Sequence, residues 1–158
     1  MIEVRSLEGP EREWAAAFLR ESWGGVVARR GELVDPTGLP GFVGHVDGER
    51  AGLATYAVRR GDCELVTIDS LREGLGVGRA LLDAVRGAAL AAGCRRLWLV
   101  TTNDNVRALG IYQRWGMELV VFRRDAVTEA RKTLKPSIPE RGANGIPIKD
   151  ELELELLL

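Results

Sequence analysis

Residues 71–82 read LREGLGVGRALL, with glycines at positions 74, 76 and 78. The residues before them, 64–70, are typical of a β-strand, and those from Gly78 onward are typical of a helix. Glycine tolerates positive φ angles and lets a ligand approach the backbone closely. Free amide N–H groups and the dipole at the start of a helix favour an anion. The stretch therefore predicts a phosphate-binding loop between a strand and a helix.

Two common nucleotide-binding loops do not match these glycines. A Walker A loop has a lysine and then a serine or threonine after its last glycine, whereas Arg79 and Ala80 follow here. A dinucleotide fingerprint needs a third glycine where Arg79 stands, and an acidic residue at the end of the next strand. That strand, residues 97–102, ends in two threonines. The phosphate group that this loop is predicted to bind therefore belongs to neither of these two classes of nucleotide ligand.

A second motif follows the strand at residues 97–102. Residues 103–117 read NDNVRALGIYQRWGM. Asn105 is expected to be the N-cap of a short helix over residues 106–115, which Gly116 ends at its C′ position.

Together these two motifs, which cover roughly residues 63–117, resemble those of the GCN5-related N-acetyltransferase (GNAT) superfamily. Its coenzyme A loop usually reads Arg/Gln-x-x-Gly-x-Gly/Ala, and its second motif reads Asn-x-x-Ala-x-x-x-Tyr-x-x-x-Gly-Phe. The second motif is matched by Asn105, Ala108, Tyr112 and Gly116, with Met117 in the Phe position.

The coenzyme A loop departs from the family pattern at one position. Glu73 stands where the family usually has arginine or glutamine. A carboxylate repels a pyrophosphate, so we expect Glu73 to point away and Arg72 or Arg79 to supply the positive charge.

The resemblance implies an α/β (α+β) fold. We expect a mixed, mostly antiparallel sheet of six to seven strands, flanked by helices, with the acyl-CoA in the splay between central strands. A single domain is expected over residues 1–158. Its acceptor-side half is residues 1–60, its acetyl-CoA-binding motifs are residues 61–117, and its C-terminal strand-helix-strand is residues 118–158.

Local patterns place the remaining elements. Asp47-Gly48 is a strong signal for a two-residue hairpin, whereas residues 22–41 are expected to be irregular. Residues 151–156 alternate glutamate and leucine, so they predict a seventh strand that buries its leucine face and leaves a polar glutamate face. Strands are expected at residues 2–7, 42–46, 51–59, 64–69, 97–102 and 118–123, and helices at residues 10–20, 78–92, 106–115 and 126–134.

By resemblance the co-substrate is acetyl-CoA, and no metal is expected. Its pyrophosphate would lie on the backbone of residues 74–80, and its pantetheine arm would add as a pseudo-strand to residues 66–68. A splay or bulge near Ile68 and Asp69 would free an N–H for the thioester oxygen. The residues implied to bind the co-substrate are Val66, Thr67, Ile68, Gly74, Leu75, Gly76, Val77, Gly78, Arg79, Ala80, Asn105 and Tyr112.

The resemblance also implies catalytic groups. Tyr112 is the expected general acid for the departing thiolate, although a core aromatic on an amphipathic helix is the alternative interpretation. The expected base is Glu64, with Asp69 or water as alternatives. Trp23, Arg29 and Arg30 lie in the segment where members of the family build the acceptor site.

Composition excludes several other classes. A net charge of −1 over 158 residues offers no footprint for nucleic acid. No apolar run is long enough to span a membrane, and the N-terminus has no signal-peptide pattern. Two cysteines, Cys63 and Cys94, favour a reducing compartment, so a cytoplasmic location is expected. The lone His45 is expected to be structural.

The predicted function is an N-acetyltransferase that moves an acetyl group from acetyl-CoA to a primary amine, by direct attack in a ternary complex. A catalytically silent acyl-CoA-binding regulatory module is the alternative, and an enzyme for longer acyl chains also stays open. The expected partner is a small-molecule or protein amine, without nucleic acid or membrane, and a homodimer is left open.

Overall fold

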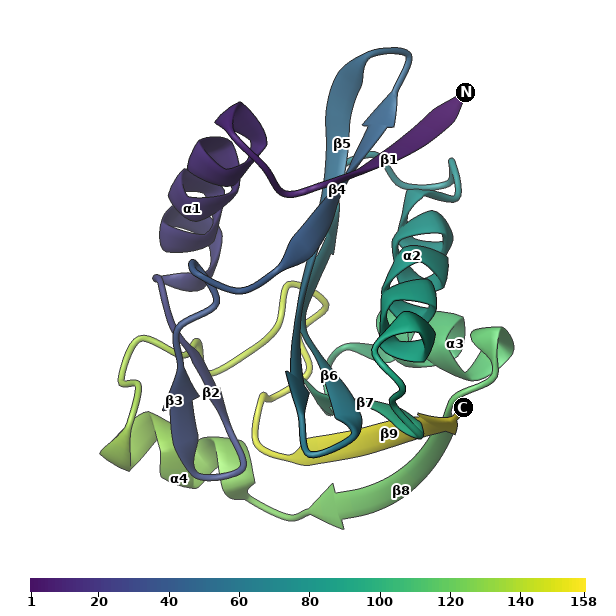
Figure 1. The fold of residues 1–158 in the computed structure, drawn as a ribbon. Coiled ribbons are helices and arrows are strands. Elements are labelled where there is room, and N and C mark those ends of the chain that lie inside the picture. Colours follow the sequence, from purple (N-terminus) through teal and green to yellow (C-terminus); the bar gives the residue numbers. More distant parts are fainter. The chain divides into compact units, whose positions relative to one another are not determined.

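The computed structural model describes all 158 residues. Seven strands form one sheet in the order β1-β4-β5-β6-β7-β9-β8, with four helices beside it (Figure 1). The pairs with a defined register are antiparallel, and the predicted fold class is confirmed. The strands of this sheet are β1 (Ile2–Ser6), β4 (Gly41–Val46), β5 (Glu49–Arg59), β6 (Asp62–Ser70), β7 (Arg96–Thr102), β8 (Glu118–Arg123) and β9 (Glu151–Leu157). The helices are α1 (Pro10–Trp23), α2 (Val77–Ala91), α3 (Val106–Trp115) and α4 (Ala126–Thr133).

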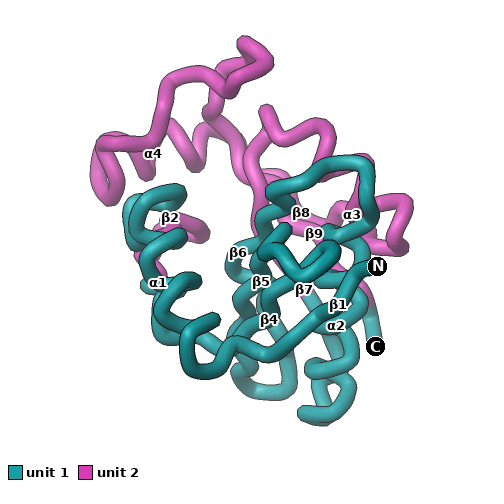
Figure 2. Tube along the Cα trace, turned by 90° about the horizontal axis from the view of Figure 1, so that it is seen from above, with its two compact units in different colours: residues 1–26, 35–97, 157–158 teal, residues 27–34, 98–156 magenta.

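The chain divides into two compact units (Figure 2). The first contains Met1–Val26, Asp35–Leu97 and Leu157–Leu158, and the second contains Val27–Val34 and Trp98–Leu156. The single domain over residues 1–158, with its three predicted segments, stays a prediction. No helix is both long and apolar enough to span a membrane.

In the first unit, β1, β4, β5 and β6 form an antiparallel meander. Its tight turns are two-residue loops in which both residues have positive φ angles, as type I′ turns require. The predicted hairpin at Asp47 (φ 50°) and Gly48 (φ 84°) is confirmed. Arg60 (φ 52°) and Gly61 (φ 81°) make the same kind of turn between β5 and β6.

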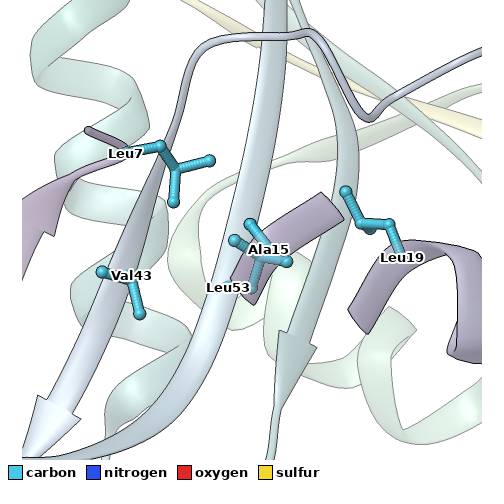
Figure 3. Packing of buried hydrophobic residues seen from close by; sticks show 5 residues of the cluster. All are labelled: Leu7, Ala15, Leu19, Val43 and Leu53. Atoms are coloured by element: carbon cyan, nitrogen blue, oxygen red, sulfur yellow. The ribbon is translucent and has the colours of Figure 1, made fainter. Parts of the chain in front are cut away.

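The two faces of this meander pack differently. On one face, side chains from α1, from the strands and from the segment after β1 form a hydrophobic cluster of Leu7, Ala15, Leu19, Val43 and Leu53 (Figure 3). On the other face, two glycines let α2 come close to the strands. A Cβ on Gly44 would lie 3.0 Å from the side chain of Val77, and one on Gly52 would lie 2.7 Å from it.

In the second unit, the segment expected to be irregular contains a hairpin. Strands β2 (Val27–Arg29) and β3 (Glu32–Val34) pair around a turn at Arg30 (φ 54°) and Gly31 (φ 75°). That part of the prediction was wrong, because strands of three residues are too short to show an alternating pattern.

The tail forms the predicted strand, but its burial is different from the prediction. β9 pairs with β8, with Glu151 opposite Arg123. Of the leucines only Leu154 is fully buried, whereas residues Glu151 and Glu153 are only 2% and 4% exposed. The predicted polar face is therefore buried, because arginines of the same unit pair with it.

Candidate active site

Strand β6 contains a bulge at Val66, the first residue of the predicted pantetheine segment. Thr67 pairs with Thr55 and Leu65 pairs with Tyr56, so Val66 has no partner in the β5 ladder. This bulge lies two residues before the predicted position, because Ile68 and Asp69 pair regularly with β5. The splay that was predicted as the alternative stays a prediction. The hydroxyls of Thr55 and Thr67 lie 2.6 Å apart and stabilise the regular pairing on this side of the bulge.

The glycine loop follows β6 and opens α2. Gly74 (φ 80°) and Gly76 (φ 84°) have positive φ angles, and Gly76 is the N-cap of the helix. Gly78 differs from both, because its φ is not positive and a Cβ there would meet nothing within 4 Å. Neither backbone strain nor packing therefore requires glycine at position 78, and the space beside it is open to a ligand.

The start of α2 offers a set of free amide donors. The first intrahelical bond runs from the Ala80 N–H to the Gly76 carbonyl over 3.0 Å. The amides of the three residues in between precede that bond and have no acceptor within the helix. No acidic residue lies in this first turn, and the exposed Arg79 adds a positive charge. These residues fit an anionic group such as a pyrophosphate.

The predicted co-substrate residues fall into the two units. Residues 66–68 and 74–80 all belong to the first unit, where strand, loop and helix are consecutive. Asn105 and Tyr112 belong to the second unit, on α3. Their joint action on one molecule of acetyl-CoA stays a prediction, and so does the splay between central strands.

Asn105 is the N-cap of α3, as predicted, although its side chain makes no capping bond. The carbonyl of Asn105 instead accepts the first helical bond from Leu109 at 3.0 Å. Its side-chain amide donates to the Thr101 hydroxyl at 2.9 Å. Asn105 is exposed, so its side-chain oxygen is left for a ligand or water.

Tyr112 is the only buried residue of α3. Its carbonyl accepts the amides of Gly116 and Met117, at 3.2 and 3.0 Å, where the helix ends at Gly116 as predicted. The backbone of Tyr112 is thus fixed by the end of its helix, and its side chain is buried.

The two candidate bases differ in their surroundings. Glu64 is 6% exposed and acts electrostatically on the neighbouring Cys63. Asp69 is half-buried, and its carboxylate accepts the indole N–H of Trp23 at 2.9 Å. Burial raises the pKa of Asp69, and the Trp23 hydrogen bond opposes that increase. No local pattern could predict this pair, because 46 positions separate its members.

The predicted acceptor residues Arg29 and Arg30 are engaged with β9 and with Trp98. The Arg30 N–H donates to both carboxylate oxygens of Glu151, at 3.2 and 3.1 Å. The Arg30 guanidinium lies 4.9 Å from the ring centroid of Trp98, and that of Arg29 lies 5.8 Å from it.

A further arginine completes this cluster. Arg123 donates to Glu153 at 2.7 Å, and its second terminal nitrogen lies 3.5 Å from Glu151. The buried glutamates of β9 therefore contact arginines from two other elements of the second unit.

His45, expected to be structural, is buried and lies 3.2 Å from the carboxylate of Glu11.

Comparison with known proteins identifies the family of this chain. A model of the acetyltransferase (GNAT) family matches residues 4–117, a range that contains every predicted site residue. The uncharacterized Bacillus subtilis (strain 168) protein YdhI is 44% identical over 115 residues, which cover 72% of this chain and 71% of YdhI. YxbD, an uncharacterized protein of the same strain, is 36% identical over 146 residues, which cover 90% of this chain and 91% of YxbD.

Among solved structures, a Bacillus subtilis acetyltransferase in complex with CoA superposes with a TM-score of 0.70. The two share 18% sequence identity, and the match covers 99% of this chain and 97% of that one. The structural likeness shows the fold, whereas the family match and the two relatives show descent. The chain belongs to the acetyltransferase (GNAT) family.

Proposed function

We propose that this protein is an N-acetyltransferase that moves the acetyl group of acetyl-CoA to a primary amine within a ternary complex. Acetyl transfer in general follows from the family. The observation that supports acetyl-CoA here is Gly78, a glycine that neither strain nor packing requires, beside the free amides of α2. The proposed acceptor is a small-molecule or protein amine.

In this proposal the pyrophosphate binds the amides at the start of α2, and the pantetheine arm runs along residues 66–68. The bulge at Val66 supports that path, because its peptide groups are not used by the β5 ladder. Asn105 contacts the same arm through its free side-chain oxygen.

The amine nitrogen then attacks the thioester carbon, a C–N bond forms and the C–S bond breaks. The leaving thiolate takes the phenolic proton of Tyr112. The transfer is feasible because a tyrosine pKa of about 10 and a thiol pKa of about 8.5 lie close together. In this proposal the Tyr112 phenol therefore acts as the general acid.

The binding test uses two glycines of the same helix. Gly78→Glu adds bulk and negative charge at the loop and should weaken acetyl-CoA binding at least tenfold, about 1.4 kcal/mol. Gly87→Glu is the matched control, since a Cβ there also meets nothing within 4 Å and Gly87 lies far along α2. Titration calorimetry of both folded variants decides, and equal affinities would remove the loop from the site.

The activity test measures free thiol released from acetyl-CoA with a panel of amines: spermidine, lysine, tyramine, kanamycin and a peptide that starts with alanine. The thiols of the protein itself add little, because Cys63 and Cys94 are buried and burial raises the pKa of Cys63 to about 12. A silent acyl-CoA-binding module would bind acetyl-CoA and release no thiol with any of these amines.

Two further parts of the proposal concern the cell. We propose a cytoplasmic location, which the two free cysteines support. The homodimer stays a prediction.

A further inference from the structure

One carboxylate in the first unit lacks a cationic partner. Asp69 makes a single hydrogen bond, from the Trp23 indole to one of its two oxygens, and takes part in no ion pair. Taking a carboxylate partly out of water without a positive partner is unfavourable. An unpaired, half-buried carboxylate at the edge of a predicted site therefore points to a role that the fold alone does not explain.

The strand register places this carboxylate on the α1 face. Directly opposite residues of an antiparallel pair share a face, and successive residues alternate between faces. Asp69 pairs with Leu53, which belongs to the cluster under α1. Gly52 and Ser70, one step along, belong to the face that meets α2.

On β5, β6 and α1, the side chains nearest to Asp69 are otherwise uncharged or point to solvent. On the strands, the nearest side chains of this face are Leu53, Thr55 and Thr67, none of which is charged. On α1, Trp23 packs against the hydrophobic cluster and holds one carboxylate oxygen. The charged residues of the last turn, Arg20 and Glu21, are exposed, and Arg20 acts on Asp35 instead.

Asp69 also lies close to the predicted path of the co-substrate. It follows directly after residues 66–68, and strand residues are about 3.3 Å apart, so it is within roughly 10 Å of any point on that segment. Glu64, in contrast, lies before the bulge, on the far side of Val66. A base must reach the amine that attacks the thioester, and the position of Asp69 suits that task better.

We infer that Asp69 is the base that takes a proton from the acceptor, that Trp23 positions its carboxylate, and that the acceptor therefore enters as a primary ammonium cation. This inference rests on the proposed function. One oxygen of Asp69 stays bound to the indole, and the other is free to accept an N–H of the ammonium. A cation entering this site supplies the missing positive partner.

The protons balance in this scheme. The ammonium gives one proton to Asp69, which later releases it to water. The neutral amine attacks the thioester carbon, and the C–S bond breaks as the C–N bond forms. Tyr112 gives its proton to sulfur and regains one from the new amide nitrogen. The products are the acetylated amine, coenzyme A with a free thiol, and one proton.

Burial gives Asp69 a better pKa for this reaction than an exposed aspartate has. An ordinary aspartate, with a pKa of about 3.9, is a weak base near neutral pH. Burial raises the pKa of Asp69, whereas the Trp23 hydrogen bond limits the increase. Removing the indole N–H should therefore raise this pKa further.

The kinetic test compares Asp69→Asn and Trp23→Phe with the wild type, on the panel amine that releases most thiol. Asp69→Asn keeps the size of the side chain and should lower kcat/KM for the amine at least 10²-fold at neutral pH. Its deficit should shrink as the pH approaches the pKa of the amine, where free amine becomes abundant. Trp23→Phe keeps an aromatic ring and should move the acidic limb of the wild-type pH profile to higher pH.

Two controls separate the possible failures. Acetyl-CoA affinity, measured by calorimetry, should stay within twofold in Asp69→Asn, and a large loss would make Asp69 a binding or structural residue and overturn the inference. An Asp69→Asn variant with unchanged kcat/KM and an unchanged pH profile would also overturn the inference about Asp69. In that case, thiol release by the wild type would still support the proposed acetyl transfer.

A third measurement needs no acceptor. The Trp23 indole N–H resonance should titrate with a midpoint above the ordinary aspartate value, and this titration should vanish in Asp69→Asn. A flat indole signal in the wild type would overturn the inference. A wild type that titrates and binds acetyl-CoA, yet acetylates none of the amines, would overturn the proposed function and the base role with it.

Discussion

At the scale of single residues, the chain contains two tyrosines in contrasting positions. Tyr112 is buried on α3, inside the motif that the family shares. Tyr56 lies on β5, with its ring stacked on that of Phe42 at 5.8 Å between centroids. Both rings pack against other parts of the fold. A substitution that removes only the hydroxyl group therefore tests whether a tyrosine has a chemical role as well as a structural one.

The substitution Tyr112→Phe should therefore keep the fold and remove the phenolic proton of the proposed general acid. We expect kcat to fall about 10²-fold or more, the scale of general acid catalysis. The KM for acetyl-CoA and the melting temperature should change far less, since the ring remains. Steady-state thiol release measures the effect, and Tyr56→Phe is the matched control. Full activity in Tyr112→Phe would leave this residue a core aromatic.

Asp69 should make stability depend on pH in a defined direction. Burial raises its pKa in the folded state, so the folded protein favours the protonated carboxyl. That contribution is present below the unfolded pKa of about 3.9 and is lost as the pH rises through the folded pKa. Asp69→Asn, which is neutral at every pH, should melt higher than the wild type at pH 7 and about equally near pH 3.

Thermal melts at both pH values check this expectation. Glu21→Gln, on the exposed last turn of α1, controls for the loss of one negative charge. A lower melting temperature for Asp69→Asn at pH 7 would contradict the sign.

At the scale of elements, two glycines decide how α2 meets the strands. A Cβ on Gly52 would lie 2.7 Å from a methyl carbon of Val77, 2.8 Å from the Asp69 carbonyl oxygen and 3.0 Å from Leu81. The carbonyl oxygen of Asp69 belongs to the backbone, so it cannot move aside as a flexible side chain can. The position of α2, which follows the glycine loop, therefore depends on the absence of a side chain at Gly52 as well as at Gly44.

Gly52→Ala should displace α2 and destabilise the protein by about 1–3 kcal/mol, as overpacking usually does. Because the displaced helix carries the amides of the loop, acetyl-CoA affinity should fall as well. Denaturant unfolding and calorimetry measure the two effects. Gly38→Ala is the control, since its Cβ would meet nothing within 4 Å, and equal behaviour of both variants would refute the packing argument.

The elements also show which local signals suffice. Asp47-Gly48 predicted its hairpin because positive φ at both residues is a local requirement. The β2–β3 hairpin uses the same kind of turn at Arg30 and Gly31, but its strands are too short to reveal themselves. Alternation predicted β9 as a strand, yet alternation cannot reveal which face is buried when arginines elsewhere neutralise the glutamates.

At the scale of the whole molecule, motifs predicted the family and the glycine loop because both are contiguous in the sequence. Several contacts of the folded chain join residues that are far apart in the sequence. Trp23 and Asp69 are 46 positions apart, and Arg30 and Glu151 are 121 apart. Only the folded chain brings such pairs together, so neither the Trp23–Asp69 hydrogen bond nor the charged cluster of β9 could be predicted.

The segment before β9 shows the same dependence on distant contacts. Asn103 donates to the Pro147 carbonyl at 2.8 Å and accepts the amides of Lys149 and Asp150 at 2.9 and 3.0 Å. Arg131 donates to the carbonyls of Ile138, Pro139 and Ile148. Two side chains thus fix a long loop, and the loop fixes where β9 begins.

Removing residues 149–158 should therefore destabilise the protein severely. The cut takes away Leu154, whose full burial is worth about 1.5–3 kcal/mol. It also deprives Arg30 and Arg123 of their acceptors, and hydrogen bonds to charged groups contribute about 1.5–3 kcal/mol. These losses are comparable with the roughly 5–15 kcal/mol that stabilise a domain.

The truncated chain should be insoluble or melt at a much lower temperature. A chain that ends at Leu157 keeps all of β9 and serves as the control. A chain ending at Ile148 with unchanged melting temperature and hydrogen exchange would show that β9 contributes nothing to stability.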